Sequence, residues 1–171
     1  MVSYDMGGTT AKICLIEDHT PRTAKTFEVA RTHRFTRGSG MPIAIPVIEM
    51  IEIGAGGGSI ATVDLLGQIR VGPLSAGAEP GPAAYGLGGT EPTVSDANLV
   101  LGRLSADTFG APGVDLDDDA ARTALDRVVG EALDMDTNTA AVGVAEVVDE
   151  NMANAAPVSY THLTLPTICS V

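Results

Sequence analysis

Cysteine is almost absent from this sequence of 171 residues, and tryptophan is absent altogether. The two cysteines, Cys14 and Cys169, lie near opposite ends of the chain. Such a pair gives neither a disulfide framework nor a spaced metal-binding motif. The chain also lacks an opening basic segment followed by an apolar run, so no secretory signal is indicated. We therefore expect a cytoplasmic protein.

Positive charge and long hydrophobic runs are scarce as well. The chain has 10 Lys and Arg against 22 Asp and Glu, a formal net charge of −12. Nucleic-acid binding depends on Lys and Arg at phosphates, so this composition argues against a nucleic-acid partner. The apolar stretch 43–51 is interrupted by Pro46 and Glu49, and it is shorter than the roughly 20 residues of a membrane span. The hydrophobic fraction of 44% still suffices for one domain with a buried core.

The first half of the chain has the pattern of β-strands. We expect strands at residues 2–5, 11–17, 25–32, 43–53, 60–63 and 69–71. The first two are joined by the turn Gly-Gly-Thr-Thr, a second turn is expected at residues 18–22, and a hairpin turn at residues 65–68. Residues 72–93 are mostly Gly, Pro, Ala and Ser, which predicts a long irregular loop.

The second half of the chain has helical periodicity. We expect a short helix that ends at Leu101, with Ser95 as its N-cap. Longer helices are expected over residues 116–133 and 139–156. The three aspartates at 117–119 resemble a metal site, but a solvated helix start at the positive end of the helix dipole is the favoured interpretation. Strands followed by helices predict a mixed α/β fold.

The end of the chain differs from the rest. Residues 157–171 carry no charged side chain and follow an acidic helix without a cap. Val158 to Thr167 can be back-translated into one reading frame of a transposon-end adapter used in sequencing libraries. We therefore expect residues 1–156 to be part of a domain and residues 157–171 to be a non-native read-through tail that does not pack on the core. Pro157 is expected to end the preceding helix. The sequence also opens directly on a strand, so we expect an upstream element to be missing.

The most informative motif is a strand that leads into a glycine turn. Gly7 and Gly8 let the backbone approach a ligand closely, and their N–H groups, which we expect to point to open space, can donate to phosphate oxygens together with the hydroxyls of Thr9 and Thr10. Asp5, at the end of the strand, would hold Mg²⁺ through its water shell. The alternative is an ordinary hairpin turn, in which Asp5 and Thr9 satisfy local backbone groups.

A second glycine cluster follows a predicted strand. Gly56, Gly57 and Gly58 are consecutive, and their cost in backbone entropy exceeds what an ordinary turn needs. They predict a loop that something approaches closely, with Ser59 as an extra hydrogen-bond donor. Either a ligand or another backbone, in a packed crossing of two strands, would explain the pattern.

A third cluster, residues 75–92, is rich in glycine and proline and is followed by Ser-Asp-Ala-Asn at residues 95–98. Asp96 is either a ligand-facing carboxylate or a first-turn residue that complements the helix dipole. No residue is identified as a catalytic nucleophile, because no histidine pairs with a cysteine. Cys14 is expected to be a small core residue.

Taken in order, these motifs resemble a known family. DMGGTTAK, IGAGGGSIATVD, RVGPLSAGAEPGPAAYGLGGTEPTVSDANLVLGRL and DENMANA are similar to the central domain of the hydantoinase A, 5-oxoprolinase and acetone carboxylase family, over most of residues 2–156. The resemblance implies an α/β fold of the actin-like ATPase (ribonuclease H-like) type, with a mixed sheet followed by helices. In such proteins two duplicated domains clamp ATP and each supplies one phosphate turn. DMGGTT resembles the second of these turns. Many relatives have an acidic residue where this chain has Lys12, which leaves the substrate subgroup open.

The resemblance also implies a function for the complete protein. ATP and Mg²⁺ would be its cofactors, a cyclic amide or a ketone its substrate, activated by phosphorylation for hydrolysis or carboxylation, and a hydantoinase B-type subunit its partner. The first phosphate turn and the adenosine-side segment lie outside this sequence, so the chain alone is expected to bind ATP weakly at most. The residues expected to bind the cofactors are Asp5, Gly7, Gly8, Thr9, Thr10, Gly56, Gly57, Gly58 and Ser59, with Asp5 as the metal ligand.

Two other functions are compatible with the motifs. A sugar kinase-like protein of the same superfamily also has an Asp-x-Gly-Gly-Thr turn, but the zinc-binding cysteines expected of it are absent here. A non-catalytic module that docks a partner subunit would need no phosphate chemistry, and it leaves the density of phosphate-type features unexplained.

Overall fold

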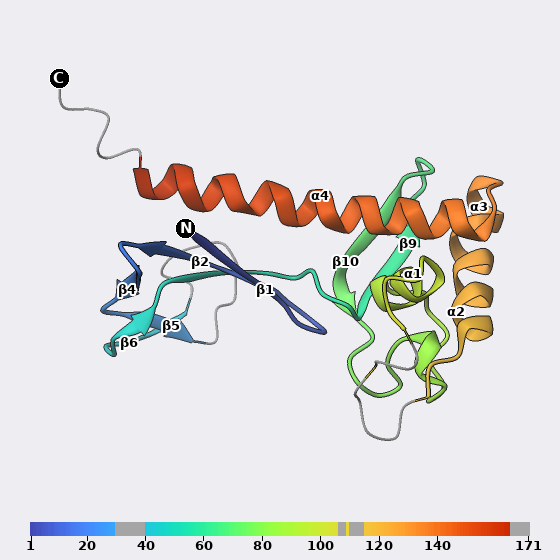
Figure 1. The fold of residues 1–171 in the computed structure, drawn as a ribbon, viewed down its shortest axis with the longest axis horizontal. Helices are drawn as coiled ribbons and strands as arrows, with labels where there is room; N and C mark the ends of the chain where they lie inside the picture. The colour runs from blue at the N-terminus through green and yellow to red at the C-terminus, as the bar shows by residue number, and fades with distance from the viewer. Residues whose placement is uncertain (30–39, 106–108, 110–114, 165–171) are drawn as a thin grey trace. The chain divides into compact units, whose positions relative to one another are not determined.

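The computed structural model describes residues 1–29, 40–105, 109 and 115–164 (Figure 1). The chain divides into two compact units. Unit 1 comprises Met1–Asp5 and Lys12–Glu52, and unit 2 comprises Met6–Ala11 and Ile53–Val171. The first glycine turn therefore belongs to the same unit as the second and third glycine clusters.

Unit 1 is built from short strands. They are β1 (Val2–Met6), β2 (Ala11–Glu17), β3 (Thr20–Pro21), β4 (Thr23–Ala24), β5 (Phe27–Val29), β6 (Met41–Ile43), β7 (Val47–Ile48) and β8 (Met50–Ile53). β1, β2 and β3 are neighbours in one sheet, in which β8 also pairs with β2. Two further ribbons join β4 to β7 and β5 to β6.

The predicted strands at residues 2–5 and 11–17 are confirmed. Along β2, Ile13 and Leu15 are buried while Lys12 is exposed, as a sheet with one covered face requires. A turn follows β2 as predicted, because Asp18 and His19 both have positive φ and Glu17 pairs with Thr20. It is shorter than the predicted range of 18–22, since Thr20 and Pro21 form β3.

Two strand predictions were wrong in extent. The strand expected at 25–32 is β5, which is shorter, and residues 30–39 lie outside the described residues. The strand expected at 43–53 is divided among β6, β7 and β8. Pro46 lies in the gap between the first two, where its missing N–H group interrupts strand pairing.

Unit 2 combines one hairpin with helices. Its elements are β9 (Ser59–Val63), β10 (Ile69–Ser75), the 3-10 helix η1 (Ala83–Tyr85), α1 (Val94–Val100), α2 (Asp118–Leu125), the π-helical turn η2 (Asp126–Gly130), α3 (Glu131–Leu133) and α4 (Thr137–Thr164). β9 and β10 pair antiparallel, with Val63 opposite Ile69. Helix α4 packs against β10 and α1 (Figure 1).

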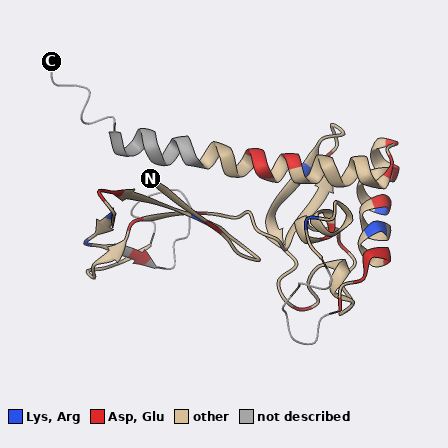
Figure 2. Ribbon diagram, in the orientation of Figure 1, with Lys and Arg blue, Asp and Glu red and all other residues tan. Residues whose placement is uncertain are grey.

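The core of unit 2 lies between these helices and the hairpin. Leu125, Val129 and Val144 are fully buried, and each contributes about 1.5–3 kcal/mol by its removal from water. Many other core positions are alanine, including Ala61, Ala97, Ala121, Ala140 and Ala141. Acidic side chains lie along the helices α2, α3 and α4 (Figure 2). The net negative charge is thus carried in part by the exposed helix faces.

The first helix begins earlier than predicted. Thr93, not Ser95, is the N-cap of α1, because the Thr93 hydroxyl accepts the Asp96 N–H while the Asp96 carboxylate accepts the Thr93 N–H. This reciprocal arrangement is a capping box, and it places Ser95 inside the first turn.

The helix predicted at 116–133 is confirmed in position but is not regular. It consists of α2, the π-helical turn η2 and α3, and it ends at Asp134, which is left-handed. Asp117 is the N-cap of α2 and accepts the Ala120 N–H at 2.9 Å. Within the described part of the chain, no three His, Cys, Asp or Glu side chains form a group that could hold a metal ion. With Asp117 as the N-cap and Asp118 and Asp119 in the first turn, the three aspartates form a helix start, as the favoured interpretation predicts.

The last helix, α4, extends beyond the predicted range of 139–156. Pro157 does not end it, and the helix continues to Thr164. Proline removes one N–H donor and strains the preceding turn, which disfavours a helix but leaves its other hydrogen bonds in place. Residues 165–171 of the predicted tail lie outside the described residues. In the part of the chain described, no helix is long and apolar enough to cross a membrane.

Candidate functional site

The predicted glycine turn joins β1 to β2. The Gly7 N–H donates to the Thr10 carbonyl at 2.9 Å and closes the turn. Gly7, Gly8 and Thr9 are exposed, and Thr10 is half-buried. The tight turn is therefore confirmed, but the expectation that the Gly7 N–H points to open space is wrong, because this donor is used within the turn.

The second glycine cluster holds this turn through its backbone. The Gly57 N–H donates to the Gly7 carbonyl at 3.0 Å, and the Gly58 N–H donates to the Gly8 carbonyl at 2.6 Å. A Cβ atom on Gly56 would lie 2.6 Å from the Gly7 oxygen and 2.8 Å from the Gly8 oxygen. Of the two explanations for the glycine run, the structure shows the approach of another backbone.

The direction of these carbonyl groups fixes the direction of the next N–H groups. In a trans peptide, the C=O and N–H groups point to opposite sides. Because the Gly7 and Gly8 carbonyls point to the glycine loop, the N–H groups of Gly8 and Thr9 point away from it. Neither N–H has a hydrogen-bond partner in the described part of the chain. The turn thus presents two adjacent backbone donors on its exposed side.

Ser59 does not share this exposed side. It is fully buried, its hydroxyl accepts the Gly56 N–H at 2.9 Å, and its own N–H donates to the Gly56 carbonyl at 3.0 Å. The remaining loop carbonyls are also used, since Gly57 accepts the Ser95 N–H and Gly58 accepts the Ala76 N–H. The loop is therefore held by its own hydrogen bonds, and it supports the turn through the bonds from Gly57 and Gly58.

Asp5 lies in β1 and is exposed. Its carboxylate has no hydrogen bond or ion pair with another described residue. Lys12, on β2, is also exposed. Cys14 is a free, half-buried cysteine and is not among the buried core residues, so the expected core position is not found.

The third cluster contributes a buried carboxylate. Asp96 is fully buried and accepts the Ala84 N–H, the Thr93 N–H and the Thr93 hydroxyl, each at 2.7 Å. Burial raises its pKa above the ordinary value, and the hydrogen bonds from Thr93 and Ala84 oppose this shift. The structure thus places Asp96 at the helix start and not on a ligand-facing surface. The spacing Thr-x-x-Asp was the signal in the sequence that indicates this role.

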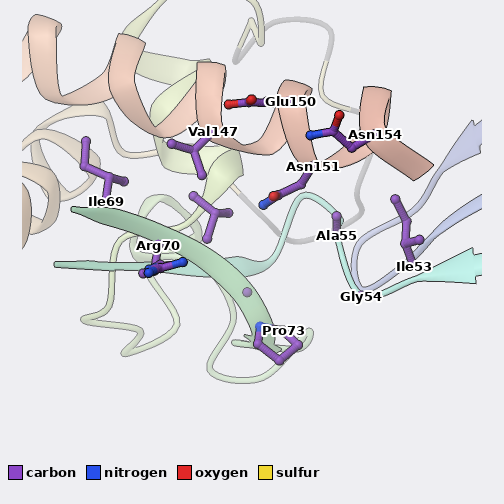
Figure 3. A pocket seen from close by; sticks show the side chains of 12 residues that line it. Ile53, Gly54, Ala55, Ile69, Arg70, Pro73, Val147, Glu150, Asn151 and Asn154 are labelled. Atoms are coloured by element: carbon purple, nitrogen blue, oxygen red, sulfur yellow. The ribbon is translucent and has the colours of Figure 1, made fainter. Parts of the chain in front are cut away.

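A pocket of about 730 Å³ lies in unit 2 between α4 and β10 (Figure 3). Asn151, Asn154 and Glu150 of α4 supply polar groups on one wall, while Val71 and Val147 are among its apolar residues. Ala55, the neighbour of Gly56, also lines it. A concave, partly apolar space of this volume has the size of a small-molecule site. The glycine loop therefore borders such a space, which the sequence did not predict.

The fold defined by these elements is that of ATP-dependent enzymes. The nucleotide-free structure of acetone carboxylase matches with a TM-score of 0.74 and 27% identity, over 90% of this chain and 21% of that chain. The crystal structure of ATP-dependent caprolactamase from Pseudomonas jessenii matches with a TM-score of 0.71 and 38% identity, over 90% of this chain and 21% of that chain. The predicted α/β, actin-like ATPase fold is confirmed.

Residues 1–158 match the Hydantoinase/oxoprolinase family, and the chain belongs to this family. It is 38% identical to caprolactamase subunit alpha of Pseudomonas jessenii, over 90% of this chain and 21% of the relative. It is also 38% identical to the acetophenone carboxylase gamma subunit of Aromatoleum aromaticum, over 91% of this chain and 20% of the relative. The chain thus spans about a fifth of the length of these curated relatives. The predicted family is confirmed.

Proposed function

We propose that the full-length protein is an ATP-dependent enzyme that activates a cyclic amide or a ketone by phosphorylation, for hydrolysis or carboxylation. In this proposal the Gly7–Thr10 turn contacts the phosphates of ATP. The observation that carries it is the pair of N–H groups at Gly8 and Thr9, which point away from the glycine loop without a partner in the described residues. Membership of a family with ATP-dependent caprolactamase and acetone carboxylase supports the same assignment.

The residues present fit the cofactors. Adjacent backbone N–H groups form anion-binding sites, and the hydroxyls of Thr9 and Thr10 add donors for phosphate oxygens. Asp5 offers an exposed carboxylate without a competing partner in the described residues. Mg²⁺ commonly binds through one or two carboxylates and keeps several waters, which suits a single carboxylate at this position.

The turn and the loop have different roles in this proposal. When bound, ATP supplies the phosphoryl group that converts an amide or ketone oxygen into a better leaving group. The chain's own residues position the phosphates and neutralise their charge, which is the main protein contribution to phosphoryl transfer. We assign direct phosphate contact to Gly8, Thr9 and Thr10, while Gly7, whose N–H donates to the Thr10 carbonyl, closes the turn. Gly56, Gly57, Gly58 and Ser59 act one layer behind them, because their backbone donors already bind the turn and each other.

A partner subunit is part of the proposal. The relatives caprolactamase subunit alpha and acetophenone carboxylase gamma subunit are named as subunits of larger enzymes. We propose a hydantoinase B-type subunit as the partner of the full-length protein. Co-purification of the two full-length subunits at constant stoichiometry tests this part, and two separate peaks in size-exclusion chromatography would contradict it.

The cofactor assignment is tested by calorimetric titration of ATP into the full-length protein. Thr9→Ala removes one proposed phosphate donor, and a hydrogen bond to a charged group contributes about 1.5–3 kcal/mol, or roughly tenfold or more in Kd. Thr62→Ala is the matched control, because Thr62 is an exposed threonine on β9 that lies outside the turn and the glycine loop. Equal affinities for the two variants would reject phosphate contact by Thr9.

Asp5→Asn tests the metal separately. We expect it to weaken ATP binding in the presence of Mg²⁺ and to leave binding in EDTA unchanged, since the carboxylate is assigned to the metal and not to the phosphates. Circular dichroism of the variant should match the wild type, because Asp5 is exposed. A loss of affinity that is the same with and without Mg²⁺ would contradict the assignment.

A further inference from the structure

The start of helix α1 is unusually well fixed. The Asp96 carboxylate, fully buried, accepts two bonds from Thr93 and one from the Ala84 N–H. Thr93 is itself fully buried. Breaking one of these bonds leaves a buried donor or acceptor unpaired, which costs more than the bond itself contributes. Thr93 and Asp96 therefore hold the first turn of α1 and the short helix η1 in one arrangement.

This fixed helix start continues directly to the glycine turn. The Ser95 N–H, in the first turn of α1, donates to the Gly57 carbonyl at 2.7 Å. The Gly57 N–H donates in turn to the Gly7 carbonyl at 3.0 Å. A Cβ atom on Gly57 would lie 2.8 Å from the Ser95 hydroxyl oxygen, so helix and loop are in tight contact. All of these residues belong to unit 2.

We infer that Thr93 and Asp96 are positioning residues for the Gly7–Thr10 turn, acting through Ser95 and the glycine loop. They fix Ser95, Ser95 fixes Gly57, and Gly57 fixes the Gly7 carbonyl, which sets the direction of the Gly8 N–H. Hydrogen bonds in such a series polarise and orient one another. The inference rests on the proposed function for its catalytic consequence, but the mechanical link to the turn is a separate property of this chain.

A positioning role of Thr93 differs from ordinary helix capping in its effect on the turn. A cap alone stabilises its own helix by about 0.5–2 kcal/mol and changes nothing in a turn elsewhere in the chain. A positioning role predicts that loss of the Thr93 hydroxyl loosens the segment Met6–Ala11, to which Thr93 makes no hydrogen bond. The coupling should be visible in that segment even when no nucleotide is present.

The test compares three variants of the full-length protein. Thr93→Val keeps the shape of the side chain and removes its hydroxyl, while Thr93→Ser keeps the hydroxyl and serves as the conservative rescue. Val129→Ala is the stability-matched control, because Val129 is fully buried in η2 and has no bond to the loop. Melting temperatures identify conditions under which Thr93→Val and Val129→Ala are equally destabilised.

Hydrogen exchange read by mass spectrometry then reports on the segment Met6–Ala11 without nucleotide. We expect Thr93→Val to raise its exchange rate about fivefold or more, in line with the coupling carried by packed hydrogen-bond networks. In Thr93→Ser and Val129→Ala, the exchange rate of this segment should stay within about twofold of the wild-type rate. Equal exchange in Thr93→Val and Val129→Ala would overturn the inference.

ATP affinity is measured on the same variants. A selective loss of affinity in Thr93→Val, restored in Thr93→Ser, supports positioning of a phosphate-binding turn. If the wild-type protein binds no ATP, the proposed function fails, and the exchange measurement still decides the positioning role by itself. The two failures are thereby distinguishable.

Discussion

The N–H group of Gly58 donates to the carbonyl oxygen of Gly8 at 2.6 Å, which joins two glycine motifs far apart in the sequence. The bond turns the Gly8 carbonyl inward and leaves the Thr9 N–H on the exposed side of the turn. The Gly57–Gly7 bond does the same for the preceding peptide. The glycine loop thus decides which backbone donors the turn presents.

The absence of a side chain at Gly56 is expected to be essential for this arrangement. In Gly56→Ala the new Cβ atom would lie 2.6 Å from the Gly7 oxygen and 2.8 Å from Gly8 backbone atoms, closer than real Cβ contacts. The turn must move, so we expect a loss of stability of about 1–3 kcal/mol, as for other overpacked sites, together with weakened ATP binding by the full-length protein. Gly8→Ala is the comparison, because nothing lies within 4 Å of its Cβ position. Denaturant unfolding should show a lower stability for Gly56→Ala than for Gly8→Ala, and similar stabilities would contradict the close approach of the glycine loop to the turn.

The sequence predicted the turn but not the hydrogen bonds from the glycine loop that support it. Gly7 and Gly8 stand between two recognisable strands, so a tight turn follows from local patterns. The bonds from Gly57 and Gly58 join backbone atoms, which carry no side-chain signal in the sequence. The glycine run showed only that a Cβ atom is not tolerated, and a ligand or another backbone would give the same pattern.

The prediction of the N-cap of α1 was wrong for a different reason. Ser95 is a good N-cap residue, yet Thr93 takes that position because Asp96 completes the capping box with it. This competition is readable from the spacing Thr-x-x-Asp. The extent of α4 beyond Pro157 is not readable in this way, because propensity alone favours a helix end there.

Asp64 is expected to make the β9–β10 hairpin sensitive to acid. Its carboxylate accepts the N–H groups of Leu66 and Gln68 and forms an ion pair with Arg70 at 2.9 Å. The Gln68 backbone bond, followed by the Arg70 side chain, lowers the pKa of Asp64 below its ordinary value of 3.8. A lowered pKa in the folded state means that the stabilisation is present above pH 3.8 and is lost as the pH falls through the folded-state pKa.

The measurement for Asp64 is the melting temperature of wild type and Asp64→Asn as a function of pH. The wild type should melt higher near neutral pH, and the difference should shrink below pH 3.8. Glu79→Gln removes an exposed carboxylate outside the hairpin and should show no such convergence. A difference that stays constant with pH would argue against a stabilising role of the ionised Asp64 carboxylate.

The contribution of Asp96 to stability is expected to depend on pH with the opposite sign to that of Asp64. Burial raises its pKa above the ordinary value of 3.8, although bonds from Thr93 and Ala84 oppose the shift. A raised pKa in the folded state means that its contribution is fully present below pH 3.8 and is lost as the pH rises through the folded-state pKa. The difference in melting temperature between wild type and Asp96→Asn, which carries no titratable group there, should therefore fall as the pH rises above 3.8. A difference that grows with pH would show that the hydrogen bonds outweigh burial.

Residues 157–171 stay predicted, from the sequence alone, to be a non-native tail that does not pack on the core. Met152 of α4 is buried, with 8% of its surface exposed, and belongs to the core cluster of unit 2. Deletion of residues 157–171 should change the free energy of unfolding by no more than about 0.5 kcal/mol, as for neutral surface changes. Met152→Ala, which leaves a cavity against the core cluster, should cost about 2–5 kcal/mol. Urea unfolding of the two variants beside the parent chain measures both values. A deletion as costly as Met152→Ala would mean that the segment packs on the core and belongs to the folded protein.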